Sequence, residues 1–528
     1  MRYPRGAVTE VLYLASPVSG VSGAPGAAAP AAPPLDAAGL VLDRTHDVTT
    51  AVSRTLARHY DCVLVEVGPH VAGGPLALLD GFLSGERAER DRERRFRRDR
   101  VLALVPPLPA ATREAILFEL GQRRIGGWLS APTPATLAAR VAELVTPAPS
   151  TRALCAAGGG ITGVYYELGV LRCLEDAFGG FSVHDFDMYF GISAGAIVTS
   201  LVANRVELDR CLRELDPTNR GGFDLDLGLR DLALRDLPSR VCSVGRHLLD
   251  YRERIRHREE RLTLTGALSQ LAALFGPFFA PDDKRRRLAE IFAEPGRTDD
   301  FRRLDRRLYI GATDQDRREH VLFGEPGVDH VPISRAVLAS AAIHPFLSSV
   351  TIDGRRYTDG FVTRTTNIVS AVERGANLVV LIDPFLPLVA EQAGFNHRHS
   401  LLWVLVQDYK TVAYTRYEQA ARALHETHPA VTVVKFLPSN RMRRLLATNP
   451  IATANFDPIV TQAYASTYRR LERMAYRLGP ALAEHGIELT LETAARKVHL
   501  LDASPAPRAE LLCAGELAPR RPRAAVAA

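Results

Sequence analysis

The stretch FGISAG, residues 190–195, holds a serine between two glycines, with one free position on each side. The apolar residues 186–190 predict a short strand, and the small, apolar residues 196–203 predict a buried helix. A serine on such a turn adopts strained backbone angles, and the glycines let strand and helix approach closely. Ser193 would start the helix, where the helix dipole favours a developing negative charge. A glycine-rich turn with an incidental serine gives the same pattern, so both interpretations stay open.

A second glycine cluster, LCAAGGGITG at residues 154–163, has the same organisation. Its apolar beginning predicts a strand, and residues 164–178 carry apolar side chains at helical spacing. Three successive glycines leave backbone N–H groups unshielded, so this loop is able to direct two donors at a phosphate or at an oxyanion.

A dinucleotide site is one alternative, because Gly158, Gly160 and Gly163 also match G-x-G-x-x-G between a strand and a helix. That site needs an acidic residue about 20 residues further on, at the end of a second strand. No acidic residue in that range closes an apolar strand, and the next clear strand leads to Ser193. No Gly-Lys-Ser or Gly-Lys-Thr follows the glycines, which argues against a P-loop. The oxyanion interpretation is favoured because it uses both glycine loops.

A nucleophilic serine also needs a proton acceptor. The segment TIDGRRYTDGFVTRTTN, residues 351–367, contains two Asp-Gly pairs that favour turns. Asp353 is expected at the tip of a hairpin, whereas Asp359 ends the returning strand, a position that presents a side chain at the edge of a sheet. Asp-Gly pairs are also ordinary turns without chemistry, so this segment alone does not establish a catalytic base.

The order of these motifs resembles the patatin-like phospholipases, which are serine acyl hydrolases. The resemblance rests on GGGITG, then GISAG, then ASAAIHPF (residues 339–346) and YTDGF, and it covers residues 151–390. It implies a Ser–Asp dyad of Ser193 and Asp359 with no metal and no cofactor. The implied glycine positions are an oxyanion hole of Gly158, Gly159, Gly160 and Gly163, an elbow of Gly191 and Gly195, and Gly360 supporting the aspartate. The implied substrate is a phospholipid or another lipid ester, cleaved through an acyl-enzyme.

Three positions depart from the family pattern. The glycine loop usually carries a basic residue where this chain has Thr162, and an aspartate where it has Ala157. The Asp-Gly pair is usually followed by a small residue, whereas this chain has Phe361, whose ring must point away from the site or crowd it. These departures keep a second hypothesis open, in which the domain is a catalytically inactive scaffold that binds lipid or protein.

Histidines offer a further alternative, a Ser-His-Asp triad. Candidates after Ser193 are His344, His397, His399, His425 and His428. His344 lies in an apolar segment and is expected in the core or in a subsite, and the others are expected at the surface. No Cys, Asp or Glu at ligand spacing accompanies them, so a metal site is not expected.

Residues 1–150 predict a separate α/β unit of five apolar strands alternating with helices. Its ending, residues 126–145, resembles the last strand and helix of a response-regulator receiver domain. Glu66 takes the place of the acceptor aspartate, Ala15 and Ser16 that of the acidic pair, and Ala131 that of the lysine. Phosphorylation is therefore not expected, and we expect a degenerate receiver-like domain for docking or oligomerisation, with an unknown protein partner.

The expected fold is thus α/β: a patatin-like three-layer α/β/α hydrolase core with a helical insertion at about 208–298, preceded by a small flavodoxin-like domain. Within the insertion, residues 262–281 carry no charge and precede the basic cluster 284–287. This segment fits a lid or an interfacial helix attracted to anionic lipid, and equally a helix packed into the core. A mainly helical extension at 391–500 and a disordered tail at 503–528 complete the expected organisation.

The composition argues against a nucleic-acid-binding protein and against a secreted one. The 528 residues carry a net charge of +6, and all but four of the 66 basic residues are arginine. No basic stretch with interleaved aromatic residues indicates nucleic-acid binding. Six widely spaced cysteines fit a reducing compartment. The N-terminal apolar run is too short for a signal-peptide core, so we expect a cytoplasmic protein with peripheral membrane contact.

Overall fold

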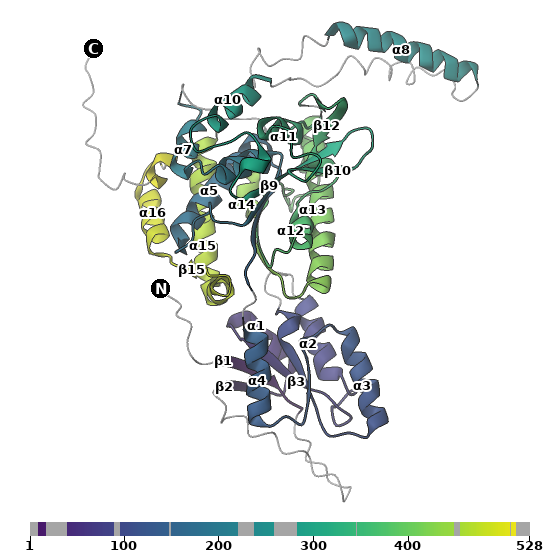
Figure 1. The fold of residues 1–528 in the computed structure, drawn as a ribbon, viewed down its shortest axis with the longest axis vertical. Coiled ribbons are helices and arrows are strands. Elements are labelled where there is room, and N and C mark those ends of the chain that lie inside the picture. The colour runs from purple at the N-terminus through teal and green to yellow at the C-terminus, as the bar shows by residue number, and fades with distance from the viewer. Residues whose placement is uncertain are drawn as a thin grey trace, which may run out of the picture.

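The computed structural model describes residues 9–16, 40–88, 96–146, 149–219, 237–257, 282–344, 346–447, 455–506 and 508–513. Its strands form two main sheets, one in a small N-terminal unit and one in a larger unit surrounded by helices (Figure 1). The uncharged segment 262–281 and the end of the predicted tail lie outside the described residues. Among the helices described, none is long and apolar enough to cross a membrane.

The N-terminal unit contains the five expected strands in a parallel sheet of order β2-β1-β3-β4-β5. The strands are β1 (Thr9–Leu14), β2 (Leu40–Thr45), β3 (Cys62–Glu66), β4 (Val101–Val105) and β5 (Gly127–Ser130). The helices are α1 (Val48–Ala57), α2 (Ala77–Ala88), α3 (Ala110–Gln122) and α4 (Pro134–Val145). Apolar side chains of α1, α2 and α3 cover one face of the sheet and those of α4 the other. This strand order is the flavodoxin-like one.

Two of the three positions compared with a receiver site, Glu66 and the pair Ala15–Ser16, meet at the carboxyl edge of this sheet. The backbone N–H of Ser16 donates to a carboxylate oxygen of Glu66 at 2.6 Å, and Ala15 is buried beside it. Glu66 therefore pairs with the backbone of the loop after β1, at a place where an acidic pair would repel it. The receiver relationship itself stays a prediction.

The larger sheet has the order β11-β12-β9-β8-β6-β13-β14, with β10 also paired to β9. Its strands are β6 (Arg152–Ala156), β8 (Met188–Ile192), β9 (Arg307–Asp314), β10 (His320–Phe323), β11 (Val350–Ile352), β12 (Arg355–Asp359), β13 (Leu378–Ile382) and β14 (Thr432–Phe436). The five strands from β9 to β14 along this order run parallel, and β10, β11 and β12 are antiparallel additions. The parallel strands are almost wholly apolar because both of their faces are covered.

Helices cover both faces, which gives the three-layer α/β/α core. One face packs against α5 (Gly160–Ala177), α6 (Ala194–Ala203), α7 (Leu208–Glu214), α11 (Ile333–Ser340), α15 (Phe456–Ala483) and α16 (Glu492–Ala503). The other packs against α12 (Ile368–Glu373) and α13 (Leu401–Thr427). The remaining helices are α8 (Leu237–Arg256), α10 (Asp282–Phe292) and α14 (Asn440–Leu446). A short pair of strands, β7 (Phe178–Gly179) and β15 (Glu488–Leu489), joins α5 to the end of α15.

The C-terminal segment belongs to this core. Its strand β14 extends the sheet, and α15 packs so closely on α5 that a Cβ on Gly169 would lie 2.4 Å from the carbonyl oxygen of Val460. The expectation of disorder from residue 503 is wrong for residues 509–512, which form a 3-10 turn with Leu512 fully buried. Arg172 and Lys497 donate to the carbonyl oxygen of Leu512 and hold this turn in place.

Candidate active site

Ser193 lies on a strained turn between β8 and α6. Its φ of 55° and ψ of −117° place a residue with a side chain in the left-handed half of conformational space. The flanking glycines are required sterically: a Cβ on Gly195 would lie 2.2 Å from the carbonyl oxygen of Ala156, and one on Gly191 would lie 2.3 Å from the hydroxyl of Thr199. This strand–turn–helix geometry is the one that a nucleophile elbow requires.

Ser340, on α11, supports this elbow and has no role in the sequence analysis. Its hydroxyl accepts the backbone N–H of Ser193 at 2.8 Å and donates to the carbonyl oxygen of Gly311 at 2.6 Å. All three groups are buried, so the elbow N–H is paired inside the core. The motif ASAAIHPF marked this segment, but only the fold shows which of its residues reaches the elbow.

The glycine loop lies directly beside the serine. A Cβ on Gly158 would lie 3.3 Å from Cβ of Ser193, and one on Gly159 would lie 2.7 Å from Cα of Gly163 and 2.8 Å from Cγ of Pro384. Helix α5 begins at Gly160, which has a φ of 64°, and Gly163 donates the first helical hydrogen bond, to Gly159 at 3.1 Å. N–H groups ahead of that bond have no acceptor within the helix, so they are available to a ligand.

Asp359 ends β12 on the same side of the sheet. Its side chain is 1% exposed, and its Oδ1 accepts the backbone N–H of Phe361 at 3.0 Å. Gly360 is required beside it, since a Cβ there would lie 2.3 Å from the carbonyl oxygen of Gly311. Burial raises the pKa of Asp359 to about 7, against smaller lowering effects from hydrogen bonds with Phe361 and with the hydroxyl of Ser193.

The structure thus brings the predicted serine, aspartate and glycine loop together. The Ser193 hydroxyl is close enough to Asp359 to affect its pKa, although Oδ2 of Asp359 is buried without a well-formed hydrogen bond to any described residue. Catalytic hydrogen bonds are often long or poorly aligned without substrate. Both side chains are less than a tenth exposed, so the site is shielded from water, as a weak base such as aspartate requires.

Two of the three departures from the family pattern, Thr162 and Phe361, have structural explanations. Thr162 is completely buried, and its hydroxyl donates to the carbonyl oxygen of Gly159 at 3.3 Å, so it stabilises the glycine loop and does not face a substrate. The ring of Phe361 packs between Phe385 and Tyr409, with centroid distances of 5.7 and 5.6 Å. Phe361 therefore belongs to an aromatic cluster next to Asp359.

The histidine alternatives have other partners. His344 interacts with the hydroxyl of Thr358 at 3.1 Å, and burial lowers its pKa. His399, in the loop before α13, packs on Trp403 in the first turn of that helix. His425 and His428 line a cavity at the opposite edge of the sheet. Among the residues described, no group of three or more His, Cys, Asp or Glu is arranged to hold a metal ion.

Two buried carboxyl groups behind the glycine loop were not found from the sequence. Asp383 directly follows β13, and burial raises its pKa to about 6. Glu167, on α5, is fully buried, neither of its carboxyl oxygens has a hydrogen-bond partner among the described residues, and burial holds its pKa well above the ordinary value. Next to Asp383, Pro384 contacts the glycine loop, so this polar cluster adjoins the site. A carboxylate after a buried strand was the available signal for Asp383.

Residues 154–372 match the family model of the patatin-like phospholipases. The chain therefore carries a patatin-like phospholipase domain, a class whose members act on lipid esters. A search of curated proteins finds no match.

Two solved structures are reported among those that this chain resembles. VipD from Legionella pneumophila is 12% identical with a TM-score of 0.25, and the match covers 67% of this chain and 76% of that one. ExoU in its complex with SpcU from Pseudomonas aeruginosa is 16% identical with a TM-score of 0.19, covering 68% of each chain. Likenesses at this level carry no inference about activity.

Proposed function

We propose that this protein is a serine acyl hydrolase that cleaves carboxyl esters of phospholipids or other lipids through Ser193 and Asp359. The observation that carries the proposal is the strained serine placed between a bare glycine loop and a buried aspartate. The strain holds the hydroxyl in one orientation, and burial raises the basicity of the carboxylate.

The reaction begins when Asp359 accepts the hydroxyl proton and Ser193 Oγ adds to the ester carbonyl carbon. The carbonyl oxygen becomes an oxyanion that the N–H groups of Gly159 and Gly160 stabilise, together with the dipole of α5. The intermediate collapses, the C–O bond to the alcohol breaks, and the alcohol leaves with the proton from Asp359. Water then attacks the acyl-enzyme with Asp359 as base, which releases the fatty acid and regenerates the serine.

The N–H donors act on charge that develops only in the transition state, so they lower the barrier without tightening substrate binding. Loss of one such donor costs about 3 to 4 kcal/mol of barrier in hydrolases of this kind. A lipid substrate is presented at a bilayer surface, and we propose peripheral membrane contact of a cytoplasmic protein on that ground.

Labelling by a fluorophosphonate probe tests the nucleophile, with wild type compared to Ser193→Ala. Wild type should be labelled and Ser193→Ala should not, and the same pair should differ in hydrolysis of phosphatidylcholine vesicles. The control Ser200→Ala changes a buried serine of α6 that donates to the carbonyl oxygen of Ile197, and it should retain labelling. Labelling of neither protein would favour the inactive scaffold, and equal labelling of both would exclude Ser193.

A further inference from the structure

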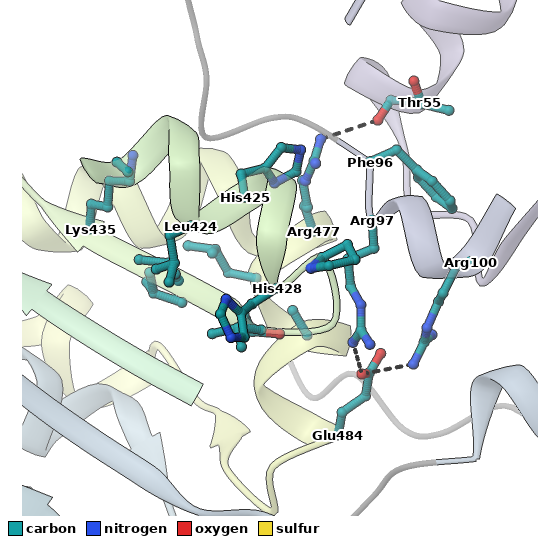
Figure 2. A pocket seen from close by; sticks show the side chains of 18 of the residues that line it. Thr55, Phe96, Arg97, Arg100, Leu424, His425, His428, Lys435, Arg477 and Glu484 are labelled. Carbon is teal, nitrogen blue, oxygen red and sulfur yellow. Dashed lines mark hydrogen bonds and ion pairs between the residues drawn. The ribbon is translucent and has the colours of Figure 1, made fainter. Parts of the chain in front are cut away.

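A cavity of about 180 Å³ lies between the N-terminal unit and the larger unit. The N-terminal walls come from the end of α1 and from residues around 97–100, and the other walls from the last turns of α13 and α15 and from β14 (Figure 2). β14 is the last strand of its sheet, and its first residues face this cavity. Ser193 follows the carboxyl end of β8, so the cavity is at the opposite edge of the sheet and separate from the candidate active site.

The lining is strongly basic. Its cationic residues are Arg58, Arg97, Arg100, Arg422, Lys435 and Arg477, against Glu484 as the one carboxylate among the lining residues of the described chain. Three of the six also have acidic partners outside the lining: Arg58 lies 3.2 Å from Asp43, Arg97 2.6 Å from Asp99 and Arg422 3.9 Å from Glu418.

Glu484 occupies the centre of this charge. Arg97 and Arg100, from the N-terminal unit, converge on its carboxylate at 3.0 and 2.8 Å (Figure 2). Arg100 is 4% exposed, and its Nε has no hydrogen-bond partner among the residues described. One carboxylate therefore pairs with two guanidinium groups, and the buried Nε–H of Arg100 remains without an acceptor among the described residues. A phosphate group has more acceptor oxygens than a carboxylate, so it is able to bind both guanidinium groups and this N–H.

His485, which follows Glu484 in the chain, is affected by the positive charge of these arginines. Its pKa is lowered to about 4, first by burial and then by Arg97, Arg152 and Arg100. Apolar and aromatic side chains, including Tyr60, Phe96 and Leu424, form the rest of the lining. The cavity thus combines a focus of positive charge with apolar walls, as sites for small organic anions do.

We propose that this cavity binds a small, soluble phosphate ester whose phosphate lies against Arg97 and Arg100 and whose organic part contacts the apolar walls. Glu484 takes the place of the phosphate in the free protein. Since the two arginines and Glu484 belong to different units, the ligand bridges the units and stabilises their docking.

The test is isothermal titration calorimetry of the full chain at fixed ionic strength, with inorganic phosphate, glycerol 3-phosphate and AMP as probes and adenosine as the uncharged control. Wild type should bind AMP or glycerol 3-phosphate more tightly than inorganic phosphate and should not bind adenosine. Glu484→Gln removes the competing carboxylate and should tighten binding by about tenfold or more. A purely structural role for the Glu484 pairs would not produce this gain.

Arg97→Gln/Arg100→Gln should weaken binding by about tenfold or more. The matched control, Arg113→Gln/Arg496→Gln, changes two exposed arginines outside the lining and should leave affinity unchanged. If Arg97→Gln/Arg100→Gln fails to fold, Glu484→Gln alone tests the proposal: tighter binding of the phosphate probes supports it, and weaker binding contradicts it. No binding of any phosphate probe at millimolar concentration, equal binding by all variants, or binding only to vesicles that carry a phosphoinositide would overturn the proposal.

Discussion

Replacement of Asp359 by asparagine should strongly reduce activity and stabilise the fold in alkaline solution. The pKa of Asp359 is about 7 in the folded protein against an ordinary 3.8, a difference of about 3 units. At 1.36 kcal/mol per unit, ionising this side chain inside the fold costs about 4 kcal/mol. Asparagine keeps the shape and an oxygen for the N–H of Phe361, but carries no charge.

The sign of the pH dependence follows from the two pKa values. Below pH 3.8 the carboxyl group is neutral in both states and costs nothing, and as the pH rises through 7 the folded state loses stability relative to the unfolded chain. The stabilisation by Asp359→Asn should therefore be about 2 to 3 kcal/mol larger at pH 8 than at pH 5. Wild-type kcat/KM should rise with an apparent pKa of about 7, and Asp359→Asn should lower it at least about a hundredfold.

Urea unfolding at pH 5 and pH 8, followed by circular dichroism, measures the stability difference, and vesicle hydrolysis measures the activity. The matched control is Asp353→Asn at the other Asp-Gly pair, whose side chain is 66% exposed. It should change stability by less than about 0.5 kcal/mol and leave activity intact. Equal effects of Asp359→Asn at both pH values would refute the reasoning, because they would mean that the carboxylate is solvated.

Three further predictions concern the groups around the dyad. Gly159→Ala should displace the glycine loop from Pro384 and lower kcat about a hundredfold or more. The control Gly121→Ala adds a methyl group to α3 where no atom lies within 4 Å, so it should keep kcat and raise the free energy of unfolding in urea by about 0.5 kcal/mol. Glu167→Leu should raise stability in urea by about 1 to 3 kcal/mol, because it removes a buried carboxyl group that has no hydrogen-bond partner among the described residues. A lower stability would contradict this account. Ser340→Ala should leave the N–H of Ser193 unpaired, cost about 1 to 3 kcal/mol of stability and reduce fluorophosphonate labelling. Unchanged labelling would show that the turn at Ser193 keeps its conformation without the Ser340 hydroxyl.

The two glycine motifs could be recognised in the sequence because closely packed backbone admits no residue other than glycine. A glycine is needed wherever backbone approaches backbone, and a Cβ on Gly159, Gly195 or Gly360 would lie within 3 Å of another atom. The strands were also visible, since parallel strands covered on both faces are continuous apolar runs. The family pattern placed Asp359 in the site, but its raised pKa comes from burial, which a single sequence does not show.

The residues that the sequence did not reveal act through contacts between distant segments. Ser340 reaches the elbow from a helix 147 residues further along the chain. Asp383 and Glu167 are ordinary acidic residues in the sequence, and their perturbation arises only because a strand end and a helix are buried together. Glu484 joins Arg97 and Arg100 across two units, which no local pattern encodes.

The amino-acid sequence by itself predicted the main strands and helices and the patatin-like motifs, because hydrophobic periodicity and glycine-rich turns are short-range patterns. It also singled out Ser193 and Asp359 as the candidates for catalysis. Only the tertiary structure decided how far the site is shielded from water, which carboxyl groups are buried, and which basic side chains meet between the two units. Solvation and electrostatic potential depend on every atom within several ångströms, and those atoms come from segments that only folding brings together.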